Sequence, residues 1–102
     1  MSELNSVIHQ PARLRIMAAL MALSAREQID FSTLGKMLKL TDGNLGAHLL
    51  TLEEAGYIKI DKSFIDRKPR THVGATLKGR HAFEDHVAAL QEILGGNGDG
   101  TK

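Results

Sequence analysis

The sequence predicts an α+β fold with a three-helix core, a β-hairpin and a long closing helix. Apolar residues recur every three or four positions in four separate segments, as they do on the buried face of a helix. Between the third and fourth of these segments, apolar and polar residues alternate as in a β-strand, and a charged turn follows. With 102 residues, of which 42% are hydrophobic, the chain has the size of one domain with one core.

The composition excludes several classes of protein. The chain has no cysteine, so it forms no disulfide and offers no thiolate to a metal ion. Its N-terminus lacks the apolar stretch of a signal peptide, and no run approaches the roughly 20 apolar residues of a membrane span. We therefore expect a cytoplasmic protein without a membrane segment. A domain of this size gains stability when a second subunit buries more of its apolar surface.

The first two helices are predicted on either side of a brief strand. A helix begins at Pro11, where a missing N–H costs no hydrogen bond, and its apolar face continues to Leu23. Residues 29–31 alternate like a short strand. Ser32 is placed to cap a second helix that ends near Lys39. The residues of this helix expected to face the core are Leu34, Met37 and Leu38.

A third helix follows directly after a tight turn. The hydroxyl of Thr41 is expected to cap it, and Asp42 in the first turn complements the helix dipole. Gly56 supplies the left-handed residue that ends it. Its buried face consists of Leu45, Leu49 and Leu52. Two helices of about eight and fourteen residues joined in this way predict a helix-turn-helix.

A hairpin and a long helix complete the chain. Residues 57–65 alternate as a strand, residues 66–70 form a charged turn, and residues 71–75 form the return strand. Thr76 caps a last helix that runs to about residue 94, and the glycine-rich tail 95–102 is expected to be disordered. Ile58, Ile60 and Phe64 share one face of the first strand, but Lys62 interrupts this apolar row, so we expect the strand to be exposed at that end.

Positive charge is concentrated in the predicted hairpin and the start of the last helix. Residues 59–80 hold seven of the thirteen lysines and arginines and only two carboxylates, which gives this segment a formal charge of +5. The whole chain carries only +1. A basic segment on a near-neutral body is typical of a surface that binds phosphates.

Three segments resemble the winged helix-turn-helix regulators related to the MarR and ArsR families. They read HQPARLRIMAAL, LTDGNLGAHLLTLEEAGYIKI and RKPRTHVGATLKGR. They correspond to the opening helix, to the turn and recognition helix leading into the wing, and to the wing with the start of the closing helix. The resemblance covers residues 7–94. Its most specific part is LEEAGYI, because helix end, left-handed glycine and strand start fall in one register.

The resemblance implies a winged helix-turn-helix fold with a C-terminal dimerisation helix. Residues 1–94 would form a DNA-binding domain that includes this helix at 76–94. The implied function is that of a homodimeric, sequence-specific regulator of transcription whose partner is double-stranded DNA. The resemblance also leaves room for a small-molecule effector, although no set of residues points to one. No cofactor and no metal are expected.

The predicted DNA contacts lie on the third helix and on the wing. The second helix of such a motif enters the major groove with its N-terminal residues, where the amide of Asn44 matches adenine. This helix face begins with Asp42 and carries no cation, so we expect affinity to depend on the wing. The predicted contact residues are Thr41, Gly43, Asn44, Ala47, His48, Thr51, Arg67, Lys68 and Arg70.

The predicted dimer contacts lie on the last helix. Its apolar stripe is broader than the surface that a single small domain readily covers. The stripe expected to contact a second copy consists of Phe83, Val87, Leu90 and Leu94.

Simpler interpretations remain open. The pattern also fits a plain three-helix core, or a winged helix that binds only other proteins. Asn44 also fits a role in starting its helix, His48 fits a packed surface residue, and residues 66–70 fit a solvated turn. His81 and Asp85 share a helix face, but exposed histidines are a better interpretation than a metal site. The sequence has no Ser/His/Asp pattern and no glycine-rich phosphate loop, which argues against an enzyme.

Overall fold

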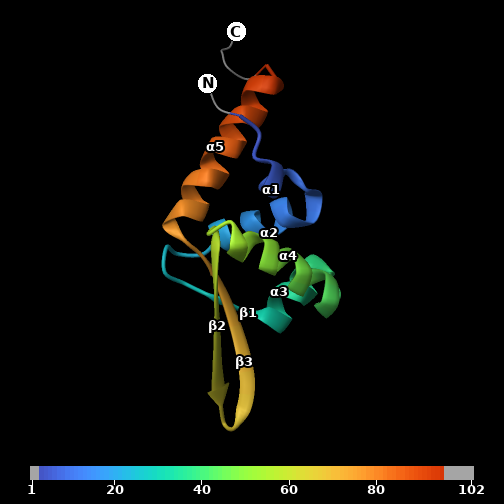
Figure 1. Ribbon diagram of the computed structural model, residues 1–102, viewed down its shortest axis with the longest axis vertical. Coiled ribbons are helices and arrows are strands. Elements are labelled where there is room, and N and C mark those ends of the chain that lie inside the picture. Colours follow the sequence, from blue (N-terminus) through green and yellow to red (C-terminus); the bar gives the residue numbers. More distant parts are fainter. Residues whose placement is uncertain (1–2, 96–102) are drawn as a thin grey trace.

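The molecule extends along one axis, with a hairpin at one end, α5 at the other and the remaining helices between them (Figure 1). The computed structural model describes residues 3–95. From the N-terminus its elements are α1 (Ser6–His9), α2 (Pro11–Met21), β1 (Ile29–Asp30), α3 (Phe31–Leu38), α4 (Asp42–Glu54), β2 (Ile58–Ile65), β3 (Lys68–Ala75) and α5 (Leu77–Ile93). This order confirms the α+β class predicted from the sequence.

The hydrophobic core lies where the four N-terminal helices meet the base of the sheet. All three leucines predicted to line the inner face of α4 are at most 1% exposed. They pack with residues from α1, α2, α3 and both long strands. The fully or almost fully buried members of this cluster are Ile8, Ile16, Met17, Leu20, Leu34, Leu45, Leu49, Leu52, Ile58 and Val73.

The start of α3 differs from the sequence prediction. The carboxylate of Asp30, and not the hydroxyl of Ser32, caps this helix by accepting the N–H of Thr33 at 3.2 Å. Asp30 ends β1 in an extended conformation, which is the backbone geometry that a capping residue needs. The helix therefore begins earlier than predicted. Met37, on the outer face of this helix, has 56% of its surface exposed. The prediction that Met37 points into the core is wrong.

The predicted cap of α4 is confirmed. The hydroxyl of Thr41 accepts the N–H of Asn44 at 3.2 Å, and Asp42 occupies the first turn. At the other end of the helix, Gly56 has a φ of +82°, as expected for the left-handed residue that stops it. The turn between α3 and α4 also uses a left-handed residue, Lys39, with a φ of +57°.

The three strands form one antiparallel sheet in the order β1-β3-β2. The β2–β3 ladder runs without a break from Ile58↔Ala75 to Ile65↔Lys68. The turn is therefore only Asp66–Arg67, with φ values of +52° and +66°, as in a tight two-residue hairpin. The predicted turn over residues 66–70 was too long, because strand pairing continues beyond the point where the sequence becomes charged.

The hairpin extends past the body of the protein, which confirms the prediction that β2 is exposed beyond Lys62. Ile58 is buried and Ile60 is half-buried, but Phe64 on the same face is 76% exposed. No described helix reaches that far along the strand (Figure 1). Alternation along a strand identifies its faces, and the polar Lys62 within the apolar row indicated where the covering layer ends.

A short helix, α1, precedes the first predicted one. The side chain of Asn5 caps it by accepting the N–H groups of Val7 and Ile8 at 2.9 and 3.0 Å. Ile8 is completely buried. Four residues give too little periodicity for a sequence pattern to reveal such a helix.

The residue that caps α5, Thr76, also connects this helix to the segment just before β2. The hydroxyl of Thr76 accepts the N–H of Gly79 at 2.9 Å and donates to the carbonyl of Gly56 at 2.6 Å, so the predicted cap is confirmed. The far end of α5 leaves the body, and Leu94 is 81% exposed. Within residues 3–95, no helix is long and apolar enough to cross a membrane. The expected disorder of the tail 95–102 lies, apart from Gly95, outside the described residues.

Candidate nucleic-acid interface

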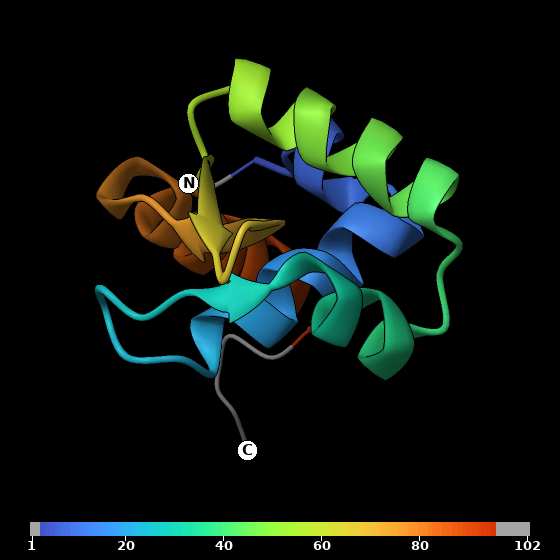
Figure 2. The same ribbon diagram turned by 90° about the horizontal axis from the view of Figure 1, so that it is seen from below.

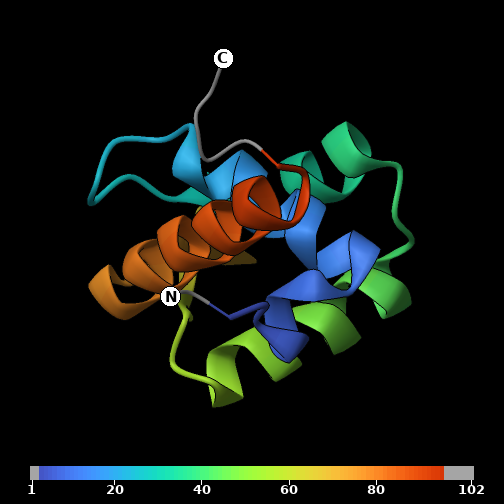
Figure 3. The same ribbon diagram turned by 90° about the horizontal axis from the view of Figure 1, so that it is seen from above.

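The hairpin projects from the body away from α5, and α4 forms part of the body beside the base of the hairpin (Figure 1). From the hairpin end, α3 and α4 lie to one side of the hairpin (Figure 2). From the opposite end, α5 lies beside α1 and α2, with which it makes contact (Figure 3). The structure thus separates a face made by α4 and the hairpin from an end made by α5.

The first turn of α4 presents exposed polar groups. Gly43, Asn44 and Ala47 are exposed, as predicted for residues on the outer face of this helix. Thr41 is also exposed, but its hydroxyl is engaged in the cap of α4. The N–H of Asn44 is satisfied by Thr41, so the Asn44 amide is not needed to start the helix. This side-chain amide makes no hydrogen bond within the described part of the chain.

The polar side chains of His48 and Thr51, in the next turns of α4, have hydrogen-bond partners within the protein. The hydroxyl of Thr51 donates to the carbonyl of Ala47 at 3.3 Å, within the same helix. His48 is half-buried, and its Nδ1 lies 3.3 Å from Nη1 of Arg13 on α2. Because a guanidinium only donates, Nδ1 of His48 accepts this hydrogen bond. His48 is therefore a partly packed residue with one ring edge still accessible.

Arg13 places a positive charge beside the recognition helix, a feature the sequence analysis missed. Its Nε donates to the carbonyl of Val7 at 2.6 Å, which fixes the guanidinium against α4. The contact joins residues 35 positions apart, so no local pattern announces it. The face of α4 carries no cation of its own, but α2 supplies one at its edge.

Four of the seven cations in the basic segment have structural partners. Arg80 donates to the carbonyls of Leu23 and Ser24 at 3.0 and 3.1 Å, just after the end of α2. Lys59 lies 3.8 Å from a carboxylate oxygen of Asp61. The ammonium of Lys78 lies 5.8 Å from the ring centre of Tyr57. The fourth cation, Arg70, belongs to the wing.

The structure places the three predicted wing cations at two levels of the hairpin. Arg67 lies in the turn and Lys68 begins β3, so both are at the tip. Arg70 is nearer the body and lies 3.7 Å from Asp30, the residue that caps α3. Among residues 3–95, Lys62, Arg67 and Lys68 form no ion pair. Within residues 59–80, the free positive charge thus lies on the hairpin, with two of the three cations at its tip.

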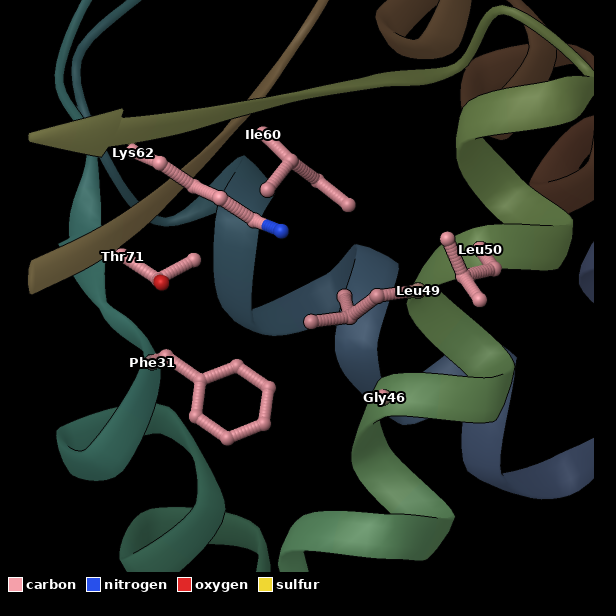
Figure 4. Close-up of a pocket in the computed structure, with 7 residues that line it drawn as sticks. All are labelled: Phe31, Gly46, Leu49, Leu50, Ile60, Lys62 and Thr71. Carbon is pink, nitrogen blue, oxygen red and sulfur yellow. The ribbon is translucent and has the colours of Figure 1, made fainter.

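A hollow of about 310 Å³ separates α4 from the hairpin (Figure 4). Apolar side chains from α3, α4 and β2 form its walls, among them Phe31, Leu50 and Ile60. The ammonium of Lys62 points into the space, and the hydroxyl of Thr71 lies on the hairpin side (Figure 4). No carboxylate lines the hollow. A positive group therefore stands between the two elements expected to contact DNA.

The apolar stripe of α5 is divided between the body and solvent. Phe83 is half-buried and packs against the core. Val87 and Leu90 are half-buried, whereas Ile93 and Leu94 are 63% and 81% exposed. The exposed apolar surface thus increases toward the end of the helix that leaves the body.

A buried histidine connects α5 to the N-terminal segment. The side chain of His86 has no exposed surface, so the expectation that the histidines are exposed is wrong for this residue. Its Nδ1 accepts the backbone N–H of Asn5 at 2.9 Å, and its Nε2 lies 3.4 Å from Nδ1 of His9. Burial, and to a lesser extent the nearby His9, lowers the pKa of His86 below its usual value.

The hydrogen bond to Asn5 defines the proton position on His86. Because Nδ1 accepts, the neutral ring carries its proton on Nε2 and donates toward His9. A protonated Nε2 has no lone pair for a metal ion. Within the described range, no group of three or more histidines and carboxylates is arranged to hold a metal.

The chain matches known proteins along almost all of this architecture. Residues 12–94 match a family described as winged helix DNA-binding domain. An uncharacterised protein of Methanocaldococcus jannaschii is 38% identical over 89 residues, which cover 87% of this chain and 89% of the relative. The solved structure of a transcriptional regulator homologue from Pyrococcus horikoshii OT3 is 35% identical, with a TM-score of 0.81. It covers 90% of this chain and 88% of that one.

A more distant structure shares the fold. A PadR family transcriptional regulator from Eggerthella lenta superposes with a TM-score of 0.68 at 21% identity, covering 89% of this chain and 85% of the regulator. These likenesses confirm the winged helix-turn-helix fold that the sequence predicted, with α4 as the second helix of the motif and the β2–β3 hairpin as the wing.

Proposed function

The chain belongs to the family of winged-helix DNA-binding domains, and from this premise we propose that it binds a specific sequence in double-stranded DNA as a homodimeric transcriptional regulator. The proposal is for a binding protein and not for an enzyme. The observation that carries it is the arrangement of α4 and the wing, where exposed polar groups on α4 and unpaired cations on the hairpin lie on neighbouring elements, with α4 to one side of the hairpin (Figure 2).

In this proposal α4 lies in the major groove. The free amide of Asn44 offers one donor and one acceptor, which match the exposed edge of adenine. Gly43 and Ala47 are small and exposed, so the helix backbone approaches the bases closely. Arg13 reaches a phosphate at the edge of the groove, beside the accessible edge of His48. Thr51 acts mainly within its own helix.

The wing supplies the cations that α4 lacks. Arg67 and Lys68 at the tip contact phosphates or enter the adjacent minor groove. Lys62 is placed for the stretch of DNA backbone between the two elements, because its ammonium points into the hollow that separates them (Figure 4). Arg70 contributes less than the sequence suggested, since Asp30 already neutralises part of its charge.

The exposed apolar side chains of α5 support the proposal of a dimer. Leu94 and Ile93 expose most of their apolar surface, and Val87 and Leu90 continue the same stripe toward the body. A second copy packed against this helix would cover the stripe. It would also place two α4 helices for successive major grooves, so that the bound site has two-fold symmetry.

Selection from a pool of random duplexes tests the proposal. We expect enrichment of a motif with dyad symmetry. No enrichment, with no salt-dependent binding to any duplex, would favour the alternative that this winged helix binds only other proteins.

Two variants then separate base readout from phosphate contact. Asn44→Ala should weaken binding to the selected site by about 1–3 kcal/mol and leave non-specific binding nearly unchanged. Lys68→Ala should weaken binding to every duplex to a similar degree. Lys78→Ala, which removes an exposed cation outside the wing, is the matched control. If Lys68→Ala changes the ratio of specific to non-specific binding and Asn44→Ala does not, the assignment of readout to α4 is wrong.

A further inference from the structure

The tip of the wing exposes apolar side chains among its cations. Phe64 is 76% exposed and Ile65 is 49% exposed, and both lie directly before the turn. Phe64 is opposite Pro69 on the neighbouring strand, and Ile65 is opposite Lys68. Because paired residues share a face of the sheet, Phe64 and Pro69 form one apolar ridge on the outermost part of the hairpin.

Nothing in the described fold uses this ridge. Phe64 belongs neither to the hydrophobic core nor to the lining of the hollow beside α4. On the same face of β2, Ile58 packs in the core, and Ile60 contacts the core and lines the hollow. The ladder is intact up to the two-residue turn, so Phe64 is held on a paired strand and not on a loose loop. A large apolar group is therefore presented at the end of a regular hairpin.

The surrounding charge favours a polyanion as the partner. Residues 62–70 contain four cations, namely Lys62, Arg67, Lys68 and Arg70, and a single carboxylate, Asp66. A duplex minor groove is about 6 Å wide, which admits side chains from the tip of a hairpin but not a helix. Proteins that enter this groove often insert Phe, Ile or Pro between base pairs, which unstacks one step and bends the DNA.

We propose that Phe64, supported by Pro69, inserts as a wedge at one base step from the minor groove and bends the bound duplex. Arg67 and Lys68 hold the phosphates on either side. The inference rests on the proposed function, because it requires duplex DNA as the ligand. It assigns to the wing tip a readout of DNA flexibility, since pyrimidine–purine steps unstack more easily than stiff A-tracts. Such readout adds specificity to a recognition helix that carries no cation.

The test uses the full chain and the duplex with the highest affinity from the random pool. Energy transfer between dyes at the two ends reports bending, and 2-aminopurine placed at successive adenines reports unstacking. The variants are Phe64→Ala, which removes the wedge, and Phe64→Leu, which keeps an apolar one. Leu77→Ala is the matched control, because Leu77 is 70% exposed but lies on α5.

We expect the wild-type protein to bend the duplex and to brighten 2-aminopurine at one step per half-site. Phe64→Ala should lose both signals and bind about tenfold more weakly, with an unchanged salt dependence, because its phosphate contacts remain. Phe64→Leu should retain much of both signals, and Leu77→Ala should behave like the wild type. Replacing the unstacked step by an A-tract should weaken the wild type about tenfold and Phe64→Ala much less.

The outcomes distinguish this inference from the proposed function. If the wild type binds its site without bending or unstacking, or if Phe64→Ala matches it in both signals, the wedge is overturned while DNA binding stands. The same result would point to a protein partner for the ridge. If no duplex is bound at all, the proposed function itself fails. Thermal unfolding of each variant confirms that it is folded, which we expect because Phe64 is exposed.

Discussion

Replacing Gly79 by alanine tests how α5 is fixed to the DNA-binding body. Gly79 is in the first turns of α5 and is buried against the start of β2. A Cβ added there would lie 2.8 Å from the carbonyl carbon of Tyr57 and closer still to its oxygen. The obstacle is backbone, which does not move aside as a flexible side chain would. We therefore expect α5 to be displaced from the strand.

The size of the effect follows from opposing contributions. Alanine is favoured over glycine in a helix interior by about 1 kcal/mol. Overpacking typically costs about 1–3 kcal/mol. Displacing α5 would also weaken two hydrogen bonds of Thr76, to Tyr57 at 3.0 Å and to Gly56 at 2.6 Å, each with a net contribution of about 1 kcal/mol. The net loss of unfolding free energy is expected to be about 2–4 kcal/mol.

Thermal and urea unfolding at one fixed protein concentration measure this loss, because the stability of a dimer depends on concentration. For a domain of this size, the loss corresponds to a fall in Tm of about 10–20 °C. Gly46→Ala is the matched control, since a Cβ at this helical position meets no atom within 4 Å. It should stabilise the protein slightly. A Gly79→Ala variant as stable as the wild type would refute the proposed contact between α5 and Tyr57.

Three further predictions concern pH, association and salt. Because the folded state lowers the pKa of His86, its contribution to the unfolding free energy should be fully present above about pH 6.5. This contribution should fall on acidification, because the unfolded chain binds a proton more readily than the folded chain. The urea midpoint should therefore fall less with pH in His86→Gln than in the control His81→Gln. Leu90→Asp should shift sedimentation equilibrium from a dimer toward the 11.1 kDa monomer, and a monomeric wild type would contradict this. Lys68→Ala should make the salt dependence of DNA binding shallower by about one unit per contact, whereas a flat wild-type response would exclude phosphate binding by the wing.

The start of α2, the caps of α4 and α5 and the left-handed glycine were predicted correctly from the sequence, because each depends on contacts between residues that are close in the chain. Pro11 begins α2, Thr41 and Thr76 cap their helices, and Gly56 ends α4, each through geometry involving only a few neighbouring residues. The cap of α3 was misassigned because two suitable residues, Asp30 and Ser32, lie close together. The strand ending at Asp30 decides between them, and strand pairing is not a local property.

The candidate site was less predictable, because much of it depends on contacts between distant segments. Asn44 and the wing cations follow from position in the motif. The hydrogen bond between Arg13 and His48 and that between Asn5 and His86 join residues far apart in the chain. No pattern within one helix distinguishes such a buried histidine from an exposed one. Likewise, a count of cations in residues 59–80 cannot separate those with structural partners from those free to bind DNA.

The division of positive charge bears on how this winged helix would recognise DNA. Arginine or lysine on the outer face of α4 would contact phosphates or the base edge of guanine, and this face has neither residue. In the proposed complex, the free amide of Asn44 would contribute discrimination without general affinity. Exposed cations without an ion pair in residues 3–95 include Lys62, Arg67 and Lys68 on the wing and Lys36 and Lys39 at the end of α3. Arg13 lies on α2, so all of these cations are outside α4. In the proposed complex, general affinity would come from elements outside α4, whereas sequence readout would be shared between Asn44 on α4 and Phe64 at the wing tip. Substitutions at Lys68 and at Asn44 would therefore alter the two properties separately.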